Sequence, residues 1–383
     1  MNLPLSYIEI SKKNLIHNIK ELKSLTKKPA RRGGGGTKIV SMIKANAYGH
    51  GQNEIAKILE PHTDYFGVNS VNELEILRKV TKKKTFVLGY VCESNLEKAL
   101  KLGCVLSVFS LDHFRKINKI VQKLKKIQEI NISIDAYLGR EGFLNDELSK
   151  FFKELKKSKY IKVVGIYAHF ANIEDTLNFS HANKQIKKYE EAVKVASLFG
   201  FCSLETHISA TSGLLAYEIN KGIHPVIRLG IGLYGLWPSE NLRVLYKNKI
   251  ELKPVLSWKT KIAQIKTLPA GSTIGYGLTY KTKKETKIAV IPQGYSDGLD
   301  RGLSNKGEVL IGGTRCKILG RIAMNMFVVD VSHLLNVKVE DEVVIIGRQK
   351  DEQITVEELA NQTGTINYEI VARLSALLPR IIK

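Results

Sequence analysis

The sequence has few cysteines and lacks any long apolar run. Its 383 residues include four cysteines and no C-x-x-C pair, which argues against a metal knuckle or a disulfide framework. No stretch approaches the roughly 20 apolar residues that cross a bilayer. The N-terminus has neither a basic start nor a continuous apolar core, so no signal peptide is indicated. We therefore expect a cytoplasmic protein with no membrane segment and no metal site.

Acidic residues are scarce relative to basic ones. Lysine and arginine number 59 against 37 aspartates and glutamates, which gives a net charge of +22. Such an excess raises nucleic acid as a partner. However, the lysines alternate with apolar residues in separate stretches at 116–126, 150–162 and 281–287, a pattern typical of solvated helix faces and strand edges. We therefore expect no nucleic-acid partner, and a surface that attracts anionic metabolites.

Short β-branched runs alternate with longer helical patterns through about the first 240 residues. A strand at 7–10 precedes a helix that Ser11 caps. Eight further strands with intervening helices favour a (β/α)8 TIM-type barrel over a doubly wound sheet of similar pattern. The eight predicted strands are 38–43, 65–68, 85–88, 105–109, 130–134, 163–167, 203–206 and 226–228, and the helices between them are 72–80, 93–102, 112–127, 148–156 and 184–198.

The pattern changes near residue 240, where the apolar runs shorten and alternate. This part predicts a mostly β C-terminal domain with one late helix at 355–363. The sequence thus predicts an α/β chain with a barrel domain over 1–240 and a mostly β domain over 241–383. The four glycines at 33–36 predict a mobile connection, since no G-x-x-x-x-G-K pattern accompanies them. The late strands are expected at 288–291, 309–311, 327–330 and 342–346, with turns at Gly271 and Gly312–Gly313.

One lysine stands in an unusual place. Lys44 directly follows the apolar run 39–43, so it lies at the end of a predicted buried strand. Burial lowers the pKa of an ammonium, as an amine that forms a Schiff base requires, whereas a lone lysine more often reaches water from a strand end. The segment 44–51, KANAYGHG, resembles the pyridoxal-phosphate lysine motif of the alanine racemases, in which the lysine carries the cofactor.

The resemblance to the alanine racemases covers nearly the whole chain. Residues 226–235 are similar to the family's R-x-G-I-x-L-Y-G segment, which implies that Arg228 contacts the pyridine nitrogen of pyridoxal 5'-phosphate. A guanidinium stays protonated, so such a site favours reprotonation at the α-carbon over transamination. A buried salt bridge is the structural alternative for this arginine. The family's phosphate contacts correspond to Tyr48, Thr211 (with Ser212 as a rival), Gly230, Ile231 and Tyr368.

Racemisation needs a proton to leave one face of Cα and return on the other. The resemblance assigns one face to Lys44 and the other to Tyr276, whose segment is similar to the family's S-Y-G-x-T-Y, with Tyr280 the weaker candidate. A tyrosine is a poor base near its ordinary pKa. In the family Arg228 and a histidine matched by His169 lie near it, although a core histidine is the alternative. The tyrosine reaches the partner's lysine, which implies a head-to-tail homodimer with composite sites.

Substrate recognition is where the chain departs from the family. The resemblance assigns the alanine carboxylate to Arg140 and the Met324 backbone N–H, and a place near the entrance to Tyr295. Ser133 stands where many members have a carbamylated lysine that holds the arginine, so Arg140 needs a chloride or another side chain to orient it. Tyr137 replaces a glycine, and Asn325 replaces an aspartate.

Taken together, the resemblance implies a pyridoxal-phosphate-dependent alanine racemase that supplies D-alanine for cell-wall peptidoglycan. A racemase of broader specificity, for example for serine, is the first alternative because the departures cluster around substrate recognition. A non-catalytic protein of pyridoxal-phosphate homeostasis resembles the barrel alone. A decarboxylase of this fold is disfavoured because such enzymes carry a carboxylate where this chain has Arg228.

Overall fold

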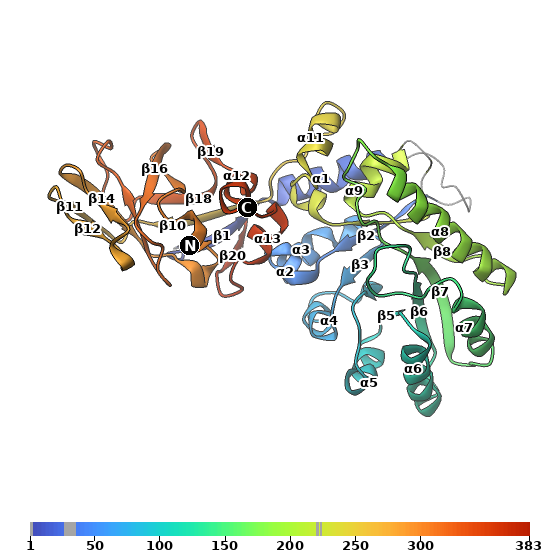
Figure 1. Ribbon diagram of the computed structural model, residues 1–383. Coiled ribbons are helices and arrows are strands. Elements are labelled where there is room, and N and C mark those ends of the chain that lie inside the picture. Colours follow the sequence, from blue (N-terminus) through green and yellow to red (C-terminus); the bar gives the residue numbers. More distant parts are fainter. Residues whose placement is uncertain (1–2, 27–35, 220–221, 223) are drawn as a thin grey trace. The chain divides into compact units, whose positions relative to one another are not determined.

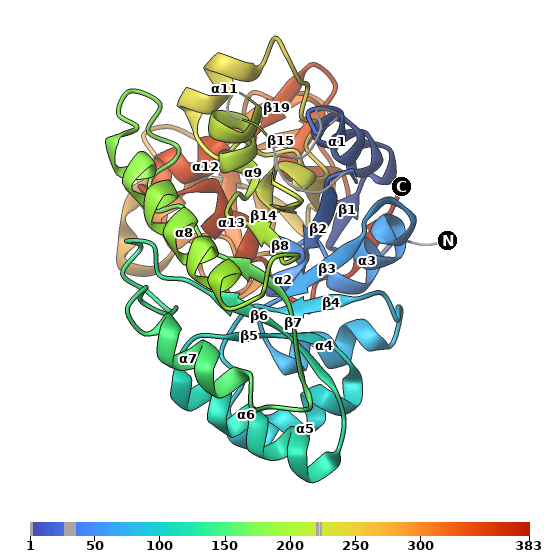
Figure 2. The same ribbon diagram turned by 90° about the vertical axis from the view of Figure 1, so that its right-hand side faces the viewer.

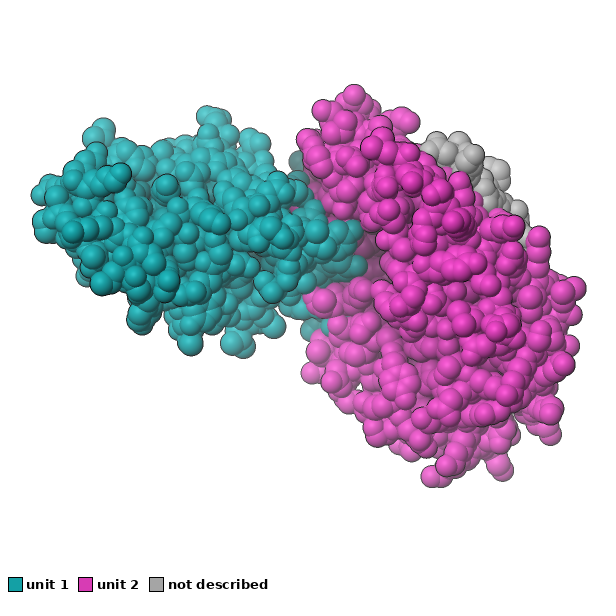
Figure 3. Space-filling view, in the orientation of Figure 1, with its two compact units in different colours: residues 1–14, 46–54, 254–383 teal, residues 15–45, 55–253 magenta. Residues whose placement is uncertain are grey.

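The computed structural model describes residues 3–26, 36–219, 222 and 224–383. It forms two compact units: unit 1 holds residues 1–14, 46–54 and 254–383, and unit 2 holds residues 15–45 and 55–253 (Figure 3). The domain boundary expected at 240/241 stays a prediction. The connection predicted at 33–36 lies outside the described residues apart from Gly36. In the part of the chain that the structure describes, no helix is long and apolar enough to span a membrane.

Unit 2 contains an eight-stranded sheet in which every paired neighbour runs parallel. The strand order is β8-β7-β6-β5-β4-β3-β2-β9, and the Arg228 N–H donates to the Ser209 carbonyl at 3.1 Å where the two end strands meet. The predicted barrel is therefore confirmed, with all eight strands found where the apolar runs lie. The strands are β2 (Lys38–Met42), β3 (Tyr65–Val68), β4 (Thr85–Val87), β5 (Val105–Val108), β6 (Gln128–Ser133), β7 (Ile161–Tyr167), β8 (Glu205–His207) and β9 (Val226–Leu229).

Helices cover the outside of this sheet, as the two views of the ribbon show (Figures 1 and 2). Parallel strands lie between a filled barrel interior and these helices, which is why their sequences are continuous apolar runs. Ser70 and Ser110 cap two of the helices by accepting backbone N–H groups three residues later. Between residues 12 and 246, the described α-helices are α1 (Lys12–Ser24), α2 (Lys44–Tyr48, with left-handed φ angles after Lys44), α3 (Gln52–Leu59), α4 (Val71–Arg78), α5 (Glu93–Leu102), α6 (Leu111–Leu124), α7 (Leu148–Leu155), α8 (Ser180–Leu198), α9 (Thr211–Gly213) and α11 (Glu240–Tyr246).

Unit 1 is mostly β, as the sequence predicts. Its main sheet has the order β11-β14-β17-β16-β15-β18-β10-β1-β20, and β19 pairs with β18. The late helix expected at 355–363 is confirmed as α12 (Val356–Thr363), and α13 (Asn367–Ala372) follows it. The strands are β1 (Tyr7–Ile10), β10 (Leu256–Lys261), β11 (Gln264–Leu268), β12 (Thr273–Ile274), β13 (Tyr280–Lys281), β14 (Thr286–Ile291), β15 (Glu308–Ile311), β16 (Thr314–Leu319), β17 (Phe327–Asp330), β18 (Glu342–Gln349), β19 (Glu352–Ile354) and β20 (Arg380–Ile382).

The first strand of the chain belongs to this sheet. β1 pairs antiparallel with β10, where Tyr7 lies opposite Lys259, and parallel with β20, where Ile8 lies opposite Arg380. The chain therefore crosses from unit 1 to unit 2 within α1, before the first barrel strand begins. Pairing over such a sequence distance leaves no local signature in the run 7–10 itself.

Candidate active site

Lys44 follows β2 and lies at the carboxyl edge of the barrel strands. Burial lowers the pKa of its ammonium, and the charges of Arg140 and Arg228 lower it further, while Glu73 acts in the opposite direction. An amine of lowered pKa is neutral for a larger fraction of the time and is a better nucleophile. The lowered pKa of Lys44 agrees with the prediction that burial at a strand end perturbs this lysine.

The chain leaves Lys44 through a left-handed turn. The φ angles of the four residues from Ala45 to Tyr48 are between 52° and 54°, a region that costs L-residues about 1–2 kcal/mol each. Asn46 Oδ1 accepts the Gln52 N–H at 2.9 Å, and Glu73 Oε1 accepts the Ala45 N–H at 2.7 Å. A run of strained non-glycine residues is typical of functional sites, where the surrounding contacts hold the backbone in place.

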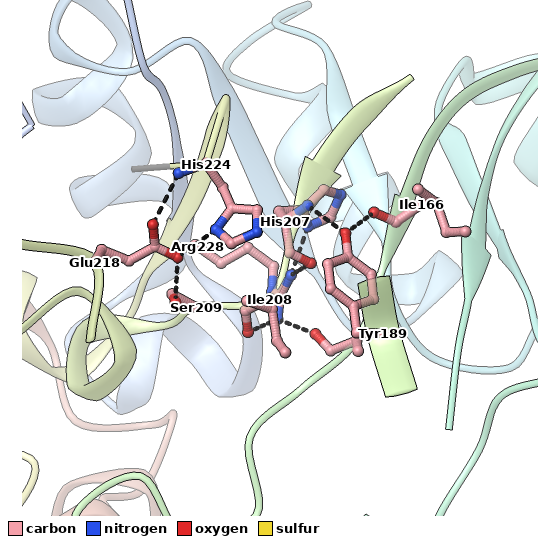
Figure 4. A network of polar contacts seen from close by, with 9 residues as sticks. Ile166, Tyr189, His207, Ile208, Ser209, Glu218, His224 and Arg228 are labelled. Atoms are coloured by element: carbon pink, nitrogen blue, oxygen red, sulfur yellow. Dashed lines mark hydrogen bonds and ion pairs between the residues drawn. The ribbon is translucent and has the colours of Figure 1, made fainter. Parts of the chain in front are cut away.

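Arg228 is buried in β9 and is held by backbone carbonyl groups (Figure 4). Its Nη2 donates to the carbonyl oxygens of Ala168 at 2.7 Å and Ile208 at 3.0 Å, and its Nη1 donates to that of His207 at 3.2 Å. Among the residues that the structure describes, no carboxylate pairs with this guanidinium, so the alternative of a buried salt bridge is not formed. Burial lowers the pKa of Arg228 to about 10, which leaves it protonated at neutral pH.

Two histidines accept hydrogen bonds from the same guanidinium. His169 Nδ1 lies 3.2 Å from Nη2, and His207 Nδ1 lies 2.5 Å from Nη1. A ring nitrogen that accepts carries no proton, so both imidazoles are neutral with the proton on Nε2. Burial and the Arg228 charge lower the pKa of His169 to about 3 and that of His207 well below its usual value. The sequence reasoning identified His169 and missed His207, although His207 ends the seventh barrel strand.

A buried carboxylate supports the segment beside Arg228 (Figure 4). Glu218, which is completely buried, accepts the Ser209 hydroxyl at 2.6 Å and both the backbone N–H and Nδ1 of His224 at 2.8 and 2.7 Å. The Ser209 carbonyl in turn accepts the Arg228 N–H at 3.1 Å. This network links Ser209 after β8 to His224 before β9, and through Ser209 it supports the backbone of the buried arginine.

Donors converge beside the end of β9. The N–H groups of Gly230 and Gly232 point at Thr211 Oγ1, at 3.2 and 3.4 Å. A Cβ on Gly232 would lie 2.6 Å from Thr211 Cγ2, so only glycine allows this approach. Ile231 begins a short 3₁₀ helix at the same point. The predicted phosphate residues Thr211, Gly230 and Ile231 are therefore close together, with a hydroxyl and backbone N–H groups of the kind that bind phosphate.

Arg140 has an acidic neighbour as its partner. Its Nε and Nη2 donate to the two carboxylate oxygens of Glu141, at 2.6 and 3.0 Å, and both side chains are partly exposed. Ser133, at the position of the family's carbamylated lysine, is buried and is the last residue of β6. Glu141 is therefore the side chain that pairs with Arg140 in the structure; whether it, a chloride or another side chain orients Arg140 for substrate stays a prediction.

The remaining predicted site residues lie in unit 1. The rings of Tyr48 and Tyr368 have centroids 6.2 Å apart, and burial raises the pKa of Tyr48 to about 12. Gly49 makes this packing possible, because a Cβ there would lie 1.8 Å from the Val371 carbonyl oxygen. The two tyrosines expected to contact one phosphate are therefore neighbours, although 320 positions separate them in the sequence.

Tyr276, Tyr295 and Met324 are exposed in unit 1, at 73%, 44% and 55%. The turn that presents Tyr276 packs on Arg321, which lies 2.5 Å from the position of a Cβ on Gly277. The Tyr295 N–H donates to the Ala323 carbonyl at 3.1 Å, next to Met324. Residues 321–323 thus contact the backbone next to Tyr276 and the backbone of Tyr295, and Met324 follows them directly.

Comparisons with known proteins agree along the whole chain. The family model described as alanine racemase, N-terminal domain, matches residues 10–238, and that of the C-terminal domain matches residues 255–382. The chain is 35% identical to an alanine racemase of Leptospira interrogans, with 98% of this chain and 95% of the relative covered. It is 36% identical to an alanine racemase of Methanococcus maripaludis, with 98% of each covered.

Solved structures give the same result. The chain superposes on alanine racemase of Clostridium difficile 630 with a TM-score of 0.90 and 31% identity, covering 100% of this chain and 97% of that one. On alanine racemase of Bacillus anthracis with bound L-Ala-P, it superposes with a TM-score of 0.91 and 30% identity, covering 100% of this chain and 96% of that one. The barrel with its lysine and the mostly β unit place the protein in the class of amino-acid racemases. Within that class, the chain belongs to the alanine racemase family.

Proposed function

We propose that this protein interconverts L-alanine and D-alanine with pyridoxal 5'-phosphate as cofactor and supplies D-alanine for cell-wall peptidoglycan in the cytoplasm. Family membership over the full length supports the reaction. The observation that carries it is the pairing of Lys44, with its lowered pKa, and Arg228, a buried cation held by neutral acceptors. Together they suit an aldehyde cofactor with a basic ring nitrogen.

The residues of unit 2 fit this cofactor. Lys44 supplies the amine that binds it covalently, and Thr211, Gly230 and Ile231, which lie close together, are assigned its phosphate. Tyr48 and Tyr368 are assigned the remaining phosphate contacts. His169, neutral over the physiological pH range, offers a flat uncharged ring for stacking. When bound, pyridoxal phosphate withdraws electrons from the substrate's Cα–H bond and makes that proton acidic.

Arg228 is assigned to the pyridine nitrogen. A guanidinium with a pKa of about 10 donates a hydrogen bond at neutral pH and keeps its proton. Arg228 would therefore keep the pyridine nitrogen unprotonated, which would favour return of the proton to Cα over transamination. A decarboxylase of this fold would place a carboxylate here.

Two residues move the proton. The Lys44 amine would take or return the proton on one face of Cα. Tyr276 is assigned the other face, from a second copy of the chain in a head-to-tail homodimer with two composite sites. Its exposure in unit 1 leaves its hydroxyl available to such a partner. The mostly β domain over 241–383 thus supplies the second base, and the barrel domain over 1–240 holds the cofactor.

Arg140 is assigned the substrate carboxylate, with the Met324 N–H as the second donor and Tyr295 near the entrance. Pairing with Glu141 through Nε and one Nη2 proton leaves the other guanidinium N–H groups for the substrate. A racemase of broader specificity remains the second candidate, because Tyr137 and Ser133 change the surroundings of Arg140.

Optical rotation tests the reaction directly. Purified protein with added pyridoxal phosphate should bring L-alanine and D-alanine separately to the same racemic end point. Rotation that stays constant from both starting solutions, with a protein that has bound the cofactor, would contradict the proposal.

A further inference from the structure

One face of α8 is turned toward the loop that carries Arg140. His181, Gln185 and Lys188 are spaced by four and three residues, so they lie on the same side of the helix. His181 Nε2 lies 3.2 Å from the Tyr137 carbonyl oxygen, and the Lys188 ammonium lies 5.8 Å from the centre of the Tyr137 ring. These two contacts flank the central residue of the face.

Gln185 is completely buried, and both ends of its amide are used. Its Nε2 donates to the carbonyl oxygens of Ala136 at 2.7 Å and His169 at 3.1 Å, and its Oε1 accepts the Ala171 N–H at 2.9 Å. Carbonyl groups only accept and the N–H only donates, so these partners fix the orientation of the amide. A single side chain therefore joins the backbone after β6 to the backbone after β7.

The loop that carries Arg140 depends on such backbone contacts. Arg140 itself is exposed and pairs with Glu141 of the same loop, so its side chain does not tie the loop to the barrel. Ser133 is too short to reach it. The Asp135 carboxylate accepts the Leu138 and Gly139 N–H groups at 2.9 and 3.0 Å, which shapes the loop internally. Beside the His181 contact with the Tyr137 carbonyl, Gln185 joins the start of this loop to the backbone after β7.

We propose that Gln185 is a positioning residue for the substrate carboxylate. Its hydrogen bonds set the separation between the loop that carries Arg140 and the backbone of His169. Arg140 is thereby placed to bind the carboxylate of a substrate held beside the cofactor. This inference rests on the proposed function for the role of Arg140. Its physical basis is the three hydrogen bonds of one buried amide, whose loss leaves two carbonyls and one N–H without that partner.

The test compares Gln185→Met with a matched control, Gln128→Met. Gln128 is also buried in the barrel, and its Nε2 donates to two backbone carbonyls, those of Cys104 and Glu129, both at 2.6 Å. Gln128 lies at the start of β6, at the opposite end of this strand from the loop that carries Arg140. Methionine keeps the length of glutamine and removes its hydrogen bonds, so both variants lose comparable contacts.

Gln185→Met should raise the KM for L-alanine about tenfold, because displacement of a binding group by a fraction of an ångström weakens its contact with substrate. Gln128→Met should leave KM unchanged. Both variants should bind pyridoxal phosphate with the wild-type absorbance spectrum. Equal KM values in the two variants would overturn the inference.

Hydrogen exchange provides a readout that does not depend on activity. Backbone amides of 136–142 and 169–171 should exchange faster in Gln185→Met than in the wild type, and Gln128→Met should leave them unchanged. Unaltered exchange in Gln185→Met overturns the inference whatever the kinetics. Absence of racemisation by the wild type in the same assay would count against the proposed function alone.

Discussion

Lys44 and Arg228 are two cations that share one buried environment, and burial lowers the pKa of both. Because the ordinary pKa of lysine is lower than that of arginine, the same environment has different consequences for the two. The lysine becomes a better nucleophile, whereas the arginine stays a permanent donor. In the proposed function, the nucleophilic lysine acts at the aldehyde of the cofactor and the protonated arginine at its pyridine nitrogen.

Replacing Lys44 by alanine should remove covalent retention of the cofactor. In the wild type, borohydride reduction should leave a pyridoxyl label on the peptide that contains Lys44, detectable by mass spectrometry. Lys44→Ala should carry no label and should not racemise alanine. A label on another lysine of the wild-type protein would contradict the assignment.

Tyr276→Phe separates the two faces of Cα. The variant should keep the cofactor, since Lys44 is intact, and should lose Cα–H exchange with deuterated solvent mainly from one alanine enantiomer. Proton NMR of each enantiomer in D₂O measures this. Exchange at wild-type rates from both enantiomers would exclude Tyr276 as the second base.

The buried His50 should lower the free energy of unfolding in acid. Burial lowers the pKa of this histidine to about 4, so between pH 6.5 and 4 the unfolded chain binds a proton that the folded chain does not. Stability is therefore lost as pH falls, by about 2 kcal/mol from this group between pH 7 and pH 5. Urea midpoints at the two pH values should differ less in His50→Gln than in the wild type. The exposed control His333→Gln should behave as the wild type does.

Among the helices and strands, the sequence predicts those whose formation depends on a local pattern of apolar residues. All eight barrel strands were predicted because parallel strands are continuous apolar runs, and most helix bounds fall within a few residues. The helix expected at 184–198 begins at Ser180, and the four added residues include His181, which contacts the Arg140 loop. The pairing of β1 with β20 was not predicted, because it depends on residues some 370 positions apart.

The residues of the candidate site also fall into those that a local sequence motif indicates and those that only the fold brings together. Motif residues such as Lys44 and Arg228 were found by resemblance, since their neighbours in sequence are distinctive. Supporting residues were not found: Gln185 lies among lysines on a helix, and its role comes only from the carbonyl groups that the fold brings to it. The left-handed turn was missed because its residues carry no glycine before Gly49.

Glycine should relieve the strain of that turn. Ala45 is exposed with φ at 52°, so Ala45→Gly should stabilise the folded protein by about 1 kcal/mol. Lys194→Gly, at an exposed position inside the right-handed helix α8, should destabilise it by about 0.5–1 kcal/mol. Chemical denaturation of the two variants measures both changes. Changes of the same sign would contradict the account of the turn.

At the scale of the whole molecule, the proposed sites need two copies of the chain. Mixing Lys44→Ala subunits with Tyr276→Ala subunits should then restore activity, because each mixed dimer contains one site with both bases intact. Random reassociation should give about a quarter of the wild-type activity, since half of the dimers are mixed and each has one working site. Two inactive proteins that stay inactive after unfolding and refolding together would show that Tyr276 does not act across a dimer.

The most direct test of the central claim is enantiomer production from a panel of L-amino acids, with and without pyridoxal phosphate, measured by chiral chromatography. We expect D-alanine as the main product, formed only with the cofactor, and little D-isomer from serine or larger amino acids. Absence of any D-amino acid from protein loaded with pyridoxal phosphate would contradict it.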